Sequence, residues 1–391
     1  MSRLDELIAE LCPDGVEYVK LGDVIKLEKG KQLNKEFLTE QGKYPAYNGG
    51  VTHSGFTDKY NYDENKIIIS QGGASAGFVN FVKTKFWANA HCYVVLPIEH
   101  YINNRYAYHF IKSKQTKLMD KQHGAGIPAL RSSEINNLKI PLPPLPVQNE
   151  IVRILDNFTE LTAELTAELT AELTARRKQY EYYRDLLLTF GDSVEYKPLG
   201  VVCDYVDYRG KTPRKVDVGI FLITAKNIRK GFIDYNISRE YIAVEDYEQV
   251  MKRGKPNVGD VLITTEAPCG NVAQLDRDDI ALAQRVIKYR GKKGVINNSY
   301  LKYVLLGTEF QMKLLRAATG GTVKGIKGSI LHKLTIPVPP IEEQERIVAI
   351  LDRFDALCND LTSGIPAEIE ARQKQYEYYR DKLLSFKEVT A

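Results

Sequence analysis

Apolar positions recur every four residues in the middle of the chain, where the tetrapeptide Leu-Thr-Ala-Glu is repeated in tandem over residues 161–175. Leu, Ala and Glu are good helix formers, and residues 147–190 contain neither Gly nor Pro. A globular helix usually spans ~8–20 residues, so the pattern predicts one unusually long helix. Because a four-residue spacing exceeds the ~3.6 residues of an α-helical turn, the leucine stripe winds around the axis. We therefore expect this helix to pack against a partner.

An internal repeat supplies that partner. Residues 178–185 and 374–381 have the same sequence, Lys-Gln-Tyr-Glu-Tyr-Tyr-Arg-Asp, and lie 196 positions apart. The same offset relates two proline-rich segments, 140–144 and 336–340, and each is followed by Gln-x-x-Ile-Val. Two long helices of equal length are therefore predicted between a proline-rich start and a tyrosine-rich end.

Breaks in the pattern predict where the helical segments begin and end. Ser-Gly-Ile-Pro at 363–366 should break or kink the second long helix and restart it with Pro366 in the first turn. Residues 3–11 carry apolar side chains at helical spacing and stop at Cys-Pro-Asp-Gly. A Val-Glu-Tyr sequence follows this short helix at 16–18 and the first long helix at 194–196. The repeat is thus circular, with the C-terminal helix ending near the N-terminal one and a pseudo-two-fold axis relating the halves.

Between the helical segments, short apolar runs alternate with polar, Gly-rich loops. Residues 66–70 and 93–96 are predicted strands and 101–122 a predicted helix. The second half repeats this order, with a strand at 261–264 and a helix at 299–318. The expected fold class is α+β or α/β, in two pseudo-repeated domains and two helical segments. The predicted boundaries are 1–146 and 191–340 for the domains and 147–190 and 341–391 for the helices.

Charge is distributed unevenly between these parts. Residues 191–340 carry 24 Lys and Arg against 16 Asp and Glu, whereas residues 341–391 carry 7 against 11. The first domain is also slightly positive and the first long helix slightly negative. This distribution is expected if the domains approach a polyanion and the helices do not.

Catalytic and cofactor motifs are missing from the sequence. It has no Asn-Pro-Pro-Tyr methyltransferase motif and no Gly-x-x-x-x-Gly-Lys-Ser/Thr phosphate loop, and Gly124-Ala-Gly126 is an isolated Gly-x-Gly. The five cysteines are scattered, and the six histidines lack metal-ligand spacing. With no apolar run of about 18 residues and no signal peptide, a cytoplasmic protein without a membrane span is expected. The chain is predicted to be a binder and organiser, with no catalytic residue and no metal.

Together, the tandem helix, the repeated octapeptide and the two proline-rich segments resemble a type I restriction–modification specificity subunit over the whole chain. The resemblance implies two target-recognition domains, each contacting one half of a bipartite site on double-stranded DNA, with two long antiparallel helices as a spacer. It also implies assembly with two modification subunits and with restriction/translocase subunits. S-adenosylmethionine and ATP are expected on those partners, and no cofactor in this chain.

Candidate DNA contacts are Lys, Arg, amide and hydroxyl side chains in Gly-flanked loops, because bases offer hydrogen bonds to amides and phosphates attract cations. For any single residue, an ordinary solvated side chain is the alternative. In the first domain the candidates are Lys29, Lys31, Tyr47, Asn48, Gln71, Ser75, Lys83, Lys85 and His123. In the second domain they are Arg209, Lys211, Arg214, Lys215, Lys226, Asn227, Arg229, Lys230, Gln284, Arg285, Lys292, Lys293 and Lys324.

The repeated octapeptide is a candidate partner-binding surface, because two identical surfaces could bind one kind of partner twice. Packing between the two long helices is the alternative for the same side chains. The candidates are Tyr180, Tyr183, Arg184, Tyr376, Tyr379 and Arg380.

Two other functions remain open from the sequence. One is a coiled-coil scaffold whose domains bind protein, which salt-dependent binding to duplex DNA would distinguish. The other is a self-contained methyltransferase or nuclease, which S-adenosylmethionine binding by the isolated chain would support.

Overall fold

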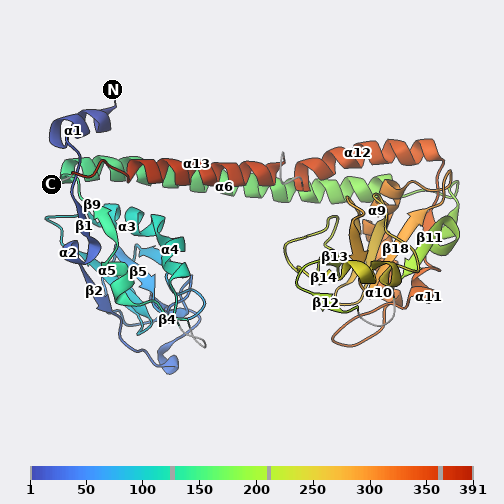
Figure 1. Ribbon diagram of the computed structural model, residues 1–391, viewed down its shortest axis with the longest axis horizontal. Coiled ribbons are helices and arrows are strands. Elements are labelled where there is room, and N and C mark those ends of the chain that lie inside the picture. The colour runs from blue at the N-terminus through green and yellow to red at the C-terminus, as the bar shows by residue number, and fades with distance from the viewer. Residues whose placement is uncertain (1, 124–127, 209–212, 360–363, 390–391) are drawn as a thin grey trace. The chain divides into compact units, whose positions relative to one another are not determined.

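A computed structural model describes residues 2–123, 128–208, 213–359 and 364–389. The chain forms two compact units. Unit 1 comprises residues 1–168 and 369–391, and unit 2 comprises residues 169–368. Each unit contains one α/β domain and part of the long helical segments (Figure 1).

The domain of unit 1 contains two main sheets and the antiparallel pair β1-β9. The first has four antiparallel strands in the order β2-β8-β5-β6, and the second has the order β4-β3-β7 with β3 and β7 parallel. The elements of this domain are α1 (Arg3–Leu11), β1 (Tyr18–Lys20), α2 (Leu21–Val24), β2 (Ile25–Lys29), η1 (Lys35–Phe37), β3 (Tyr44–Tyr47), β4 (Gly55–Thr57), β5 (Lys66–Ser70), β6 (Val79–Val82), β7 (Trp87–Ala88), β8 (Cys92–Pro97), α3 (Asn104–Ser113), α4 (Gln115–Asp120), α5 (Ser132–Asn136) and β9 (Lys139–Pro141).

The domain of unit 2 repeats this topology with one additional strand, β12, in its second sheet. Its first sheet has the order β11-β18-β15-β16 and its second the order β12-β14-β13-β17, with β13 and β17 parallel. Its elements are β10 (Tyr196–Pro198), α7 (Leu199–Val202), β11 (Cys203–Asp207), β12 (Lys215–Val216), β13 (Ile220–Ile223), β14 (Tyr241–Ile242), η2 (Val244–Asp246), α8 (Tyr247–Val250), β15 (Val261–Thr265), β16 (Cys269–Gln274), β17 (Ile280–Leu282), β18 (Val286–Gly291), α9 (Asn298–Leu306), α10 (Thr308–Ala317), α11 (Gly328–Leu331) and β19 (Thr335–Pro337).

Strand β5 is buried on both faces, which explains its uninterrupted apolar sequence. Ile67 and Ile69 belong to the core shared with helix α3, while Ile68 belongs to the core of the second sheet. In unit 2, Val261 and Ile263 of β15 belong to the core beneath α9, while Leu262 belongs to the core of the second sheet. The predicted strands at 66–70, 93–96 and 261–264 are therefore confirmed.

Each predicted domain helix is in fact a pair of helices. The segment expected at 101–122 is α3 and α4, and the segment expected at 299–318 is α9 and α10. In unit 2, Gly307 has an extended backbone and forms the N-cap of α10. In unit 1, the hydroxyl of Ser113 donates to the Phe110 carbonyl at 2.8 Å, a local bond that competes with continuation of the helix.

The two long helical segments span equal lengths, as predicted, but they end at 187 and 383, before the predicted 190 and 391. Helix α6 (Leu145–Leu187) is one helix of 43 residues. The second segment consists of α12 (Ile341–Asn359) and α13 (Ile365–Leu383). Pro366 is the second residue of α13, as the sequence predicts, because its fixed φ and missing N–H suit a first helical turn.

Within each unit, part of α6 packs antiparallel against part of the second segment. In unit 1, Phe158 lies 6.0 Å from the Tyr379 ring, and Thr159 lies beside Tyr376. In unit 2, the ring of Tyr183 stacks on Phe354 at 5.7 Å. These ring pairs are related by the 196-residue offset, since 158 corresponds to 354 and 183 to 379.

The two ends of the chain meet inside unit 1. The Val16 N–H donates to the Lys387 carbonyl at 2.9 Å, and Leu4 and Leu384 belong to one core. Gly15 has φ +112°, and a Cβ there would lie 2.4 Å from the Lys387 carbonyl oxygen, so this approach requires glycine. The predicted proximity of the C-terminal helix to the N-terminal one is confirmed.

Candidate nucleic-acid interface

In unit 1, several loops leave the first sheet at the same end of its strands. Lys29 at the end of β2 pairs with Tyr93, and Ser70 at the end of β5 pairs with Cys92. The loops after β2 and β5 and the loop before β8 therefore meet, and we call this set of loops the loop edge of unit 1. It places Lys29, Lys31, Gln71 and Ser75 in one region.

Two further connections bring the remaining loops to this edge. Tyr47 ends β3, and its carbonyl accepts the Asn89 N–H at 2.8 Å. Burial raises the pKa of the Tyr47 phenol, which therefore stays a neutral donor. His123 forms a bridge with Ala129 in the segment whose Leu130 N–H donates to the Gln71 carbonyl at 2.8 Å.

A hollow of about 680 Å³ opens at the loop edge of unit 1. It is lined by Gln32, Leu33, Asn34, Lys35, Leu38, Asn48, Ser54 and Asn89. The buried Asn89 shapes its floor, because its Oδ1 accepts the Leu33 N–H at 3.2 Å and the Ala90 N–H at 2.7 Å. Exposed amides in such a hollow suit the bidentate pattern of an adenine edge. Gln32, Asn34 and Ser54 were missed from the sequence, although each is a polar residue in a segment without regular strand alternation.

Lys83 and Lys85, also candidate DNA contacts, lie away from the loop edge. They follow β6, whose last residue Val82 pairs with Lys66 at the start of β5. Both lysines therefore lie at the other end of the strands from the loop edge. Lys83 instead lines a cleft of about 590 Å³ with Glu160 and Glu164 of α6. The Nζ of Lys85 lies 3.3 Å from the Tyr60 hydroxyl and 3.4 Å from Asp63, and these contacts raise the lysine pKa.

Unit 2 has an equivalent loop edge. The end of β11 pairs with the start of β18, so Gln284 and Arg285 lie where the loop after β15 also leaves the sheet. A bridge between Glu266 and Gly325 brings the exposed Lys324 to the same place. Arg285 has φ +70° and lies 3.2 Å from the Glu266 carboxylate. This region is the loop edge of unit 2.

The basic candidates between β11 and β15 that the structure describes lie in two different places. Lys226, Arg229 and Lys230 lie in a segment that runs beside the edge strand β16. The Gly231 N–H of this segment donates to the Val272 carbonyl at 2.8 Å. Arg214 is exposed, and Lys215 of β12 forms an ion pair with Glu240 at 2.7 Å. Arg209 and Lys211 lie outside the described residues.

One candidate of unit 2 requires correction, and two others lie away from the loop edge. Asn227 is fully buried, its Nδ2 donates to the carbonyls of Asp234 and Ser238, and its Oδ1 accepts the Thr224 N–H. That side chain closes a loop and cannot also contact a base. Lys292 and Lys293 follow the end of β18, which pairs with the start of β11, so they lie opposite the loop edge. Composition alone could not distinguish them from the lysines at the loop edge.

The repeated octapeptide lies in different surroundings in the two units. In unit 2, Tyr180 is 7% exposed within the core, and burial raises its pKa. Arg184 is 8% exposed and donates to Asp185 at 2.9 Å. As partner-contacting residues these two were wrong, because packing inside the unit already occupies both side chains. The equivalent Tyr376 is half-buried, with its hydroxyl 3.0 Å from that of Thr159.

The exposed side chains of the octapeptide are different tyrosines. Tyr182 and Tyr378 are 64% and 63% exposed, and each packs edge-on against the following tyrosine. Those following tyrosines, Tyr183 and Tyr379, are 38% and 40% exposed. Arg380 is half-buried and donates to Asp381 at 2.8 Å. Tyr182 and Tyr378 were not among the predicted contacts, because the sequence does not show where the partner helix lies.

Neither a metal-binding cluster nor a membrane-spanning helix is found in residues 2–123, 128–208, 213–359 and 364–389. In these ranges no cluster of three or more His, Cys, Asp or Glu is arranged to hold a metal ion. No helix in them is long and apolar enough to cross a membrane. The cysteines are free thiols, and burial raises the pKa of Cys92 to about 11. The candidate interface consists of the polar and basic loops at the loop edges of the two domains.

Such a molecule is a two-domain recognition protein with repeated halves. The sequence profile of the type I restriction modification DNA specificity domain matches residues 13–175 and again residues 192–371. The chain belongs to this family.

Relatives of the whole chain agree with that assignment. A putative type I restriction enzyme specificity subunit of Haemophilus influenzae is 33% identical, over 95% of this chain and 96% of the relative. The specificity subunit of the type I restriction enzyme EcoR124I/EcoR124II of Escherichia coli is 34% identical, over 99% and 97%. The fold is similar to that of a chain solved in work on complex assembly and conformational transition of the type I R–M system. That chain gives a TM-score of 0.64 at 18% identity, with 96% of this chain and 98% of that chain covered.

Proposed function

We propose that this chain is the DNA-specificity subunit of a type I restriction–modification complex, a non-catalytic protein that recognises a bipartite duplex target. The observation that carries the proposal is the pairing of a constant frame with variable loops. The four-stranded first sheets of both domains have the same strand order, whereas the loop edges carry different side chains. Two recognition domains of one topology with different loops suit two different short sequences.

The helical repeat supports a spacer between the two sequences. Each Leu-Thr-Ala-Glu unit adds four residues, or ~6 Å of helix, which compares with one or two base-pair steps of ~3.4 Å. The number of units would therefore set how many base pairs lie unread between the half-sites.

The partners in this proposal are double-stranded DNA, two modification subunits and restriction/translocase subunits. The exposed Tyr182 and Tyr378 would provide two chemically matched contacts for the modification subunits, because aromatic side chains are favoured in protein interfaces. S-adenosylmethionine and ATP would bind to the partners, since none of the motifs for either is present in this chain.

The experiment is a deletion of residues 162–165 in the assembled complex, read out by single-molecule mapping of DNA methylation. We expect the gap between the half-sites to change by one or two base pairs while both half-sites keep their sequence, because four residues of helix correspond to ~6 Å. The unaltered chain, assembled and mapped in parallel, serves as the control. A changed half-site sequence, with the gap unaltered, would contradict the spacer.

Salt-dependent binding separates this proposal from a protein-binding scaffold. A specificity subunit that contacts phosphates must bind a duplex of random sequence more weakly as salt increases. Failure of the full chain and of its complex to bind such a duplex at low salt would favour the scaffold.

A further inference from the structure

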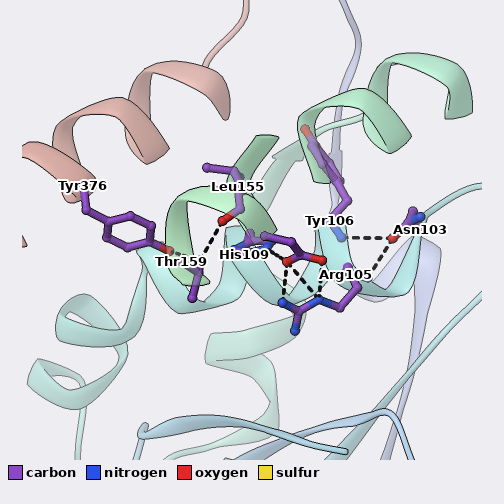
Figure 2. Close-up of polar contacts among 8 residues, drawn as sticks. Asn103, Arg105, Tyr106, His109, Leu155, Thr159 and Tyr376 are labelled. Carbon is purple, nitrogen blue, oxygen red and sulfur yellow. Dashed lines mark hydrogen bonds and ion pairs between the residues drawn. The ribbon is translucent and has the colours of Figure 1, made fainter. Parts of the chain in front are cut away.

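A polar cluster, buried at His109 and partly open to solvent at Asp156, joins the domain of unit 1 to its part of helix α6. His109 of α3 is 1% exposed, and its Nε2 lies 2.7 Å from the Asp156 carboxylate of α6. The Nε of Arg105 donates to both oxygens of the same carboxylate, at 3.1 and 3.2 Å. Figure 2 shows Arg105 and His109 reaching the carboxylate from one helix.

The arginine in this cluster is itself held in place. Its guanidinium lies 4.3 Å from the centre of the Phe81 ring and 4.8 Å from that of Tyr108. Two stacking contacts and a carboxylate fix the direction of the guanidinium. Arg105 therefore orients Asp156 toward His109.

Neighbouring hydrogen bonds tie the start of α3 to α6. The Asn103 side chain caps α3 by accepting the N–H groups of Arg105 and Tyr106, at 2.7 and 3.2 Å (Figure 2). The Asn103 N–H in turn donates to Gln148 of α6 at 2.8 Å. The cluster at Asp156 lies two helical turns further along α6, so it fixes the angle at which the domain meets the helix.

Unit 2 has the same backbone joint with two chemical differences, the first being Ser299 at the position of Arg105. The Asn297 N–H donates to Gln344 at 2.8 Å, as Asn103 does to Gln148. At the position of His109, unit 2 has Tyr303, whose hydroxyl donates to Asp352. An imidazole that titrates near neutral pH has thus been replaced by a phenol that does not.

The charges around His109 come from three helices. Asp156 faces it from α6, Arg105 from its own helix, and Arg380 from α13. Burial lowers the pKa of His109 below 6.5; the hydrogen bond to Asp156 acts in the opposite direction, and the two guanidinium groups add to the lowering. At neutral pH the ring is therefore neutral, with its proton on Nε2 facing the carboxylate. The buried Nδ1 makes no hydrogen bond to the described residues, so a second proton there would have no acceptor.

We propose that His109 is a positioning residue, which together with Arg105 and Asp156 forms a proton-sensitive joint between the first domain and helix α6. The joint holds the loop edge of unit 1 at a set angle when the imidazole is neutral and loosens when it is protonated. Tyr303 and Asp352 form the non-titrating counterpart in unit 2. One consequence rests on the proposed function: recognition of one half-site weakens in mild acid while recognition of the other does not.

The direction of the pH effect follows from the lowered pKa of His109. As the pH falls below 6.5, the unfolded or detached imidazole binds a proton before the buried one does. The stabilisation from this joint is therefore complete above pH 6.5 and is lost as the pH falls toward the lowered pKa. Asp156, whose pKa is also lowered, adds a loss only in stronger acid.

The test is amide hydrogen exchange of the full chain, compared between helices α3 and α9 at about pH 7.5 and 5.5 after correction for intrinsic rates. We expect exchange in α3 to rise by up to about tenfold at the lower pH, because one pH unit below 6.5 changes the free energy by at most ~1.4 kcal/mol. Exchange in α9 should not rise. His109→Gln keeps a donor toward Asp156 without titrating and should abolish the rise. Tyr303→Phe is the matched control in unit 2 and should leave it unchanged.

Two outcomes would overturn the joint: an equal rise in α3 and α9, or a rise that persists in His109→Gln. If that variant fails to fold, histidine NMR of the unsubstituted chain decides, since one imidazole must titrate below pH 6.5, with its neutral form protonated on Nε2. Its absence rejects the proposal. Neither measurement uses DNA, so a failure of duplex binding would reject the proposed function and leave the joint standing.

Discussion

Gln148 in unit 1 and Gln344 in unit 2 make the same three hydrogen bonds with the same lengths. Each side-chain oxygen accepts a backbone N–H at 2.8 Å, and each amide nitrogen donates to two carbonyls at 3.0 and 2.8 Å. The loop edges of the two units, by contrast, share almost no side chains. A frame that depends on backbone groups tolerates any loop sequence, and this is why the loops can differ so widely on one scaffold.

The octapeptide gives the opposite comparison, since its sequence is the same in both units and its surroundings are not. Asp185 in unit 2 accepts the Thr308 N–H at 3.1 Å at the start of α10. Asp381 in unit 1 is 57% exposed and pairs only with its neighbour Arg380 among the described residues. Identical residues thus have different roles because α4 and α10 begin differently.

The largest effect is expected when the shared anchor is broken. Gln148→Ala and Gln344→Ala should each lower the free energy of unfolding by about 3 kcal/mol, because buried backbone groups lose their partners. Urea denaturation of the full chain measures this, and the exposed Gln41→Ala is the control. A loss at one site but not at the other would show that the two frames are not equivalent.

A second comparison concerns the two ends of the strands in the first sheet of unit 1. Lys29→Ala with Lys31→Ala should weaken binding to a random duplex roughly tenfold and reduce the log–log salt slope by about 2, since each lost phosphate contact changes the slope by ~0.9. Lys83→Ala with Lys85→Ala, at the other end of the strands, should leave the slope unchanged. Equal slopes for both double variants would remove the loop edge as the DNA-binding side.

The smallest effect is expected at the octapeptide. Asp185→Ala removes a side chain that caps α10 and should cost about 1 kcal/mol of unfolding free energy. Asp381→Ala should cost close to nothing, because an exposed ion pair stabilises little. Thermal unfolding of both variants side by side tests the comparison, which fails if the two losses are the same.

Much of the scaffold was predictable because it depends on local sequence. Helix α6, the restart of α13 at Pro366 and the strands β5 and β15 follow from residue periodicity and from the fixed φ of proline. The split of α3 from α4 was not predicted, because the turn at Lys114 lacks Gly and Pro.

The candidate interface was predicted less well. Lys29 and Lys83 look alike in sequence, and only strand pairing places them at opposite ends of the strands of one sheet. Asn227 and Asn48 are both loop amides, but the side chain of Asn227 is already hydrogen-bonded within its own loop. Tyr180 and Tyr182 lie two residues apart on a helix, so the position of the neighbouring helix decides which one is exposed.

The amino-acid sequence by itself determined the repeated halves, the long helices and the location of the variable loops, because periodicity and internal identity are properties of the chain alone. Only the tertiary structure decided which basic and aromatic side chains remain accessible, and which of them meet. Burial and hydrogen-bond partners depend on residues far apart in the sequence, as His109 and Asp156 are, and no local pattern records such an encounter.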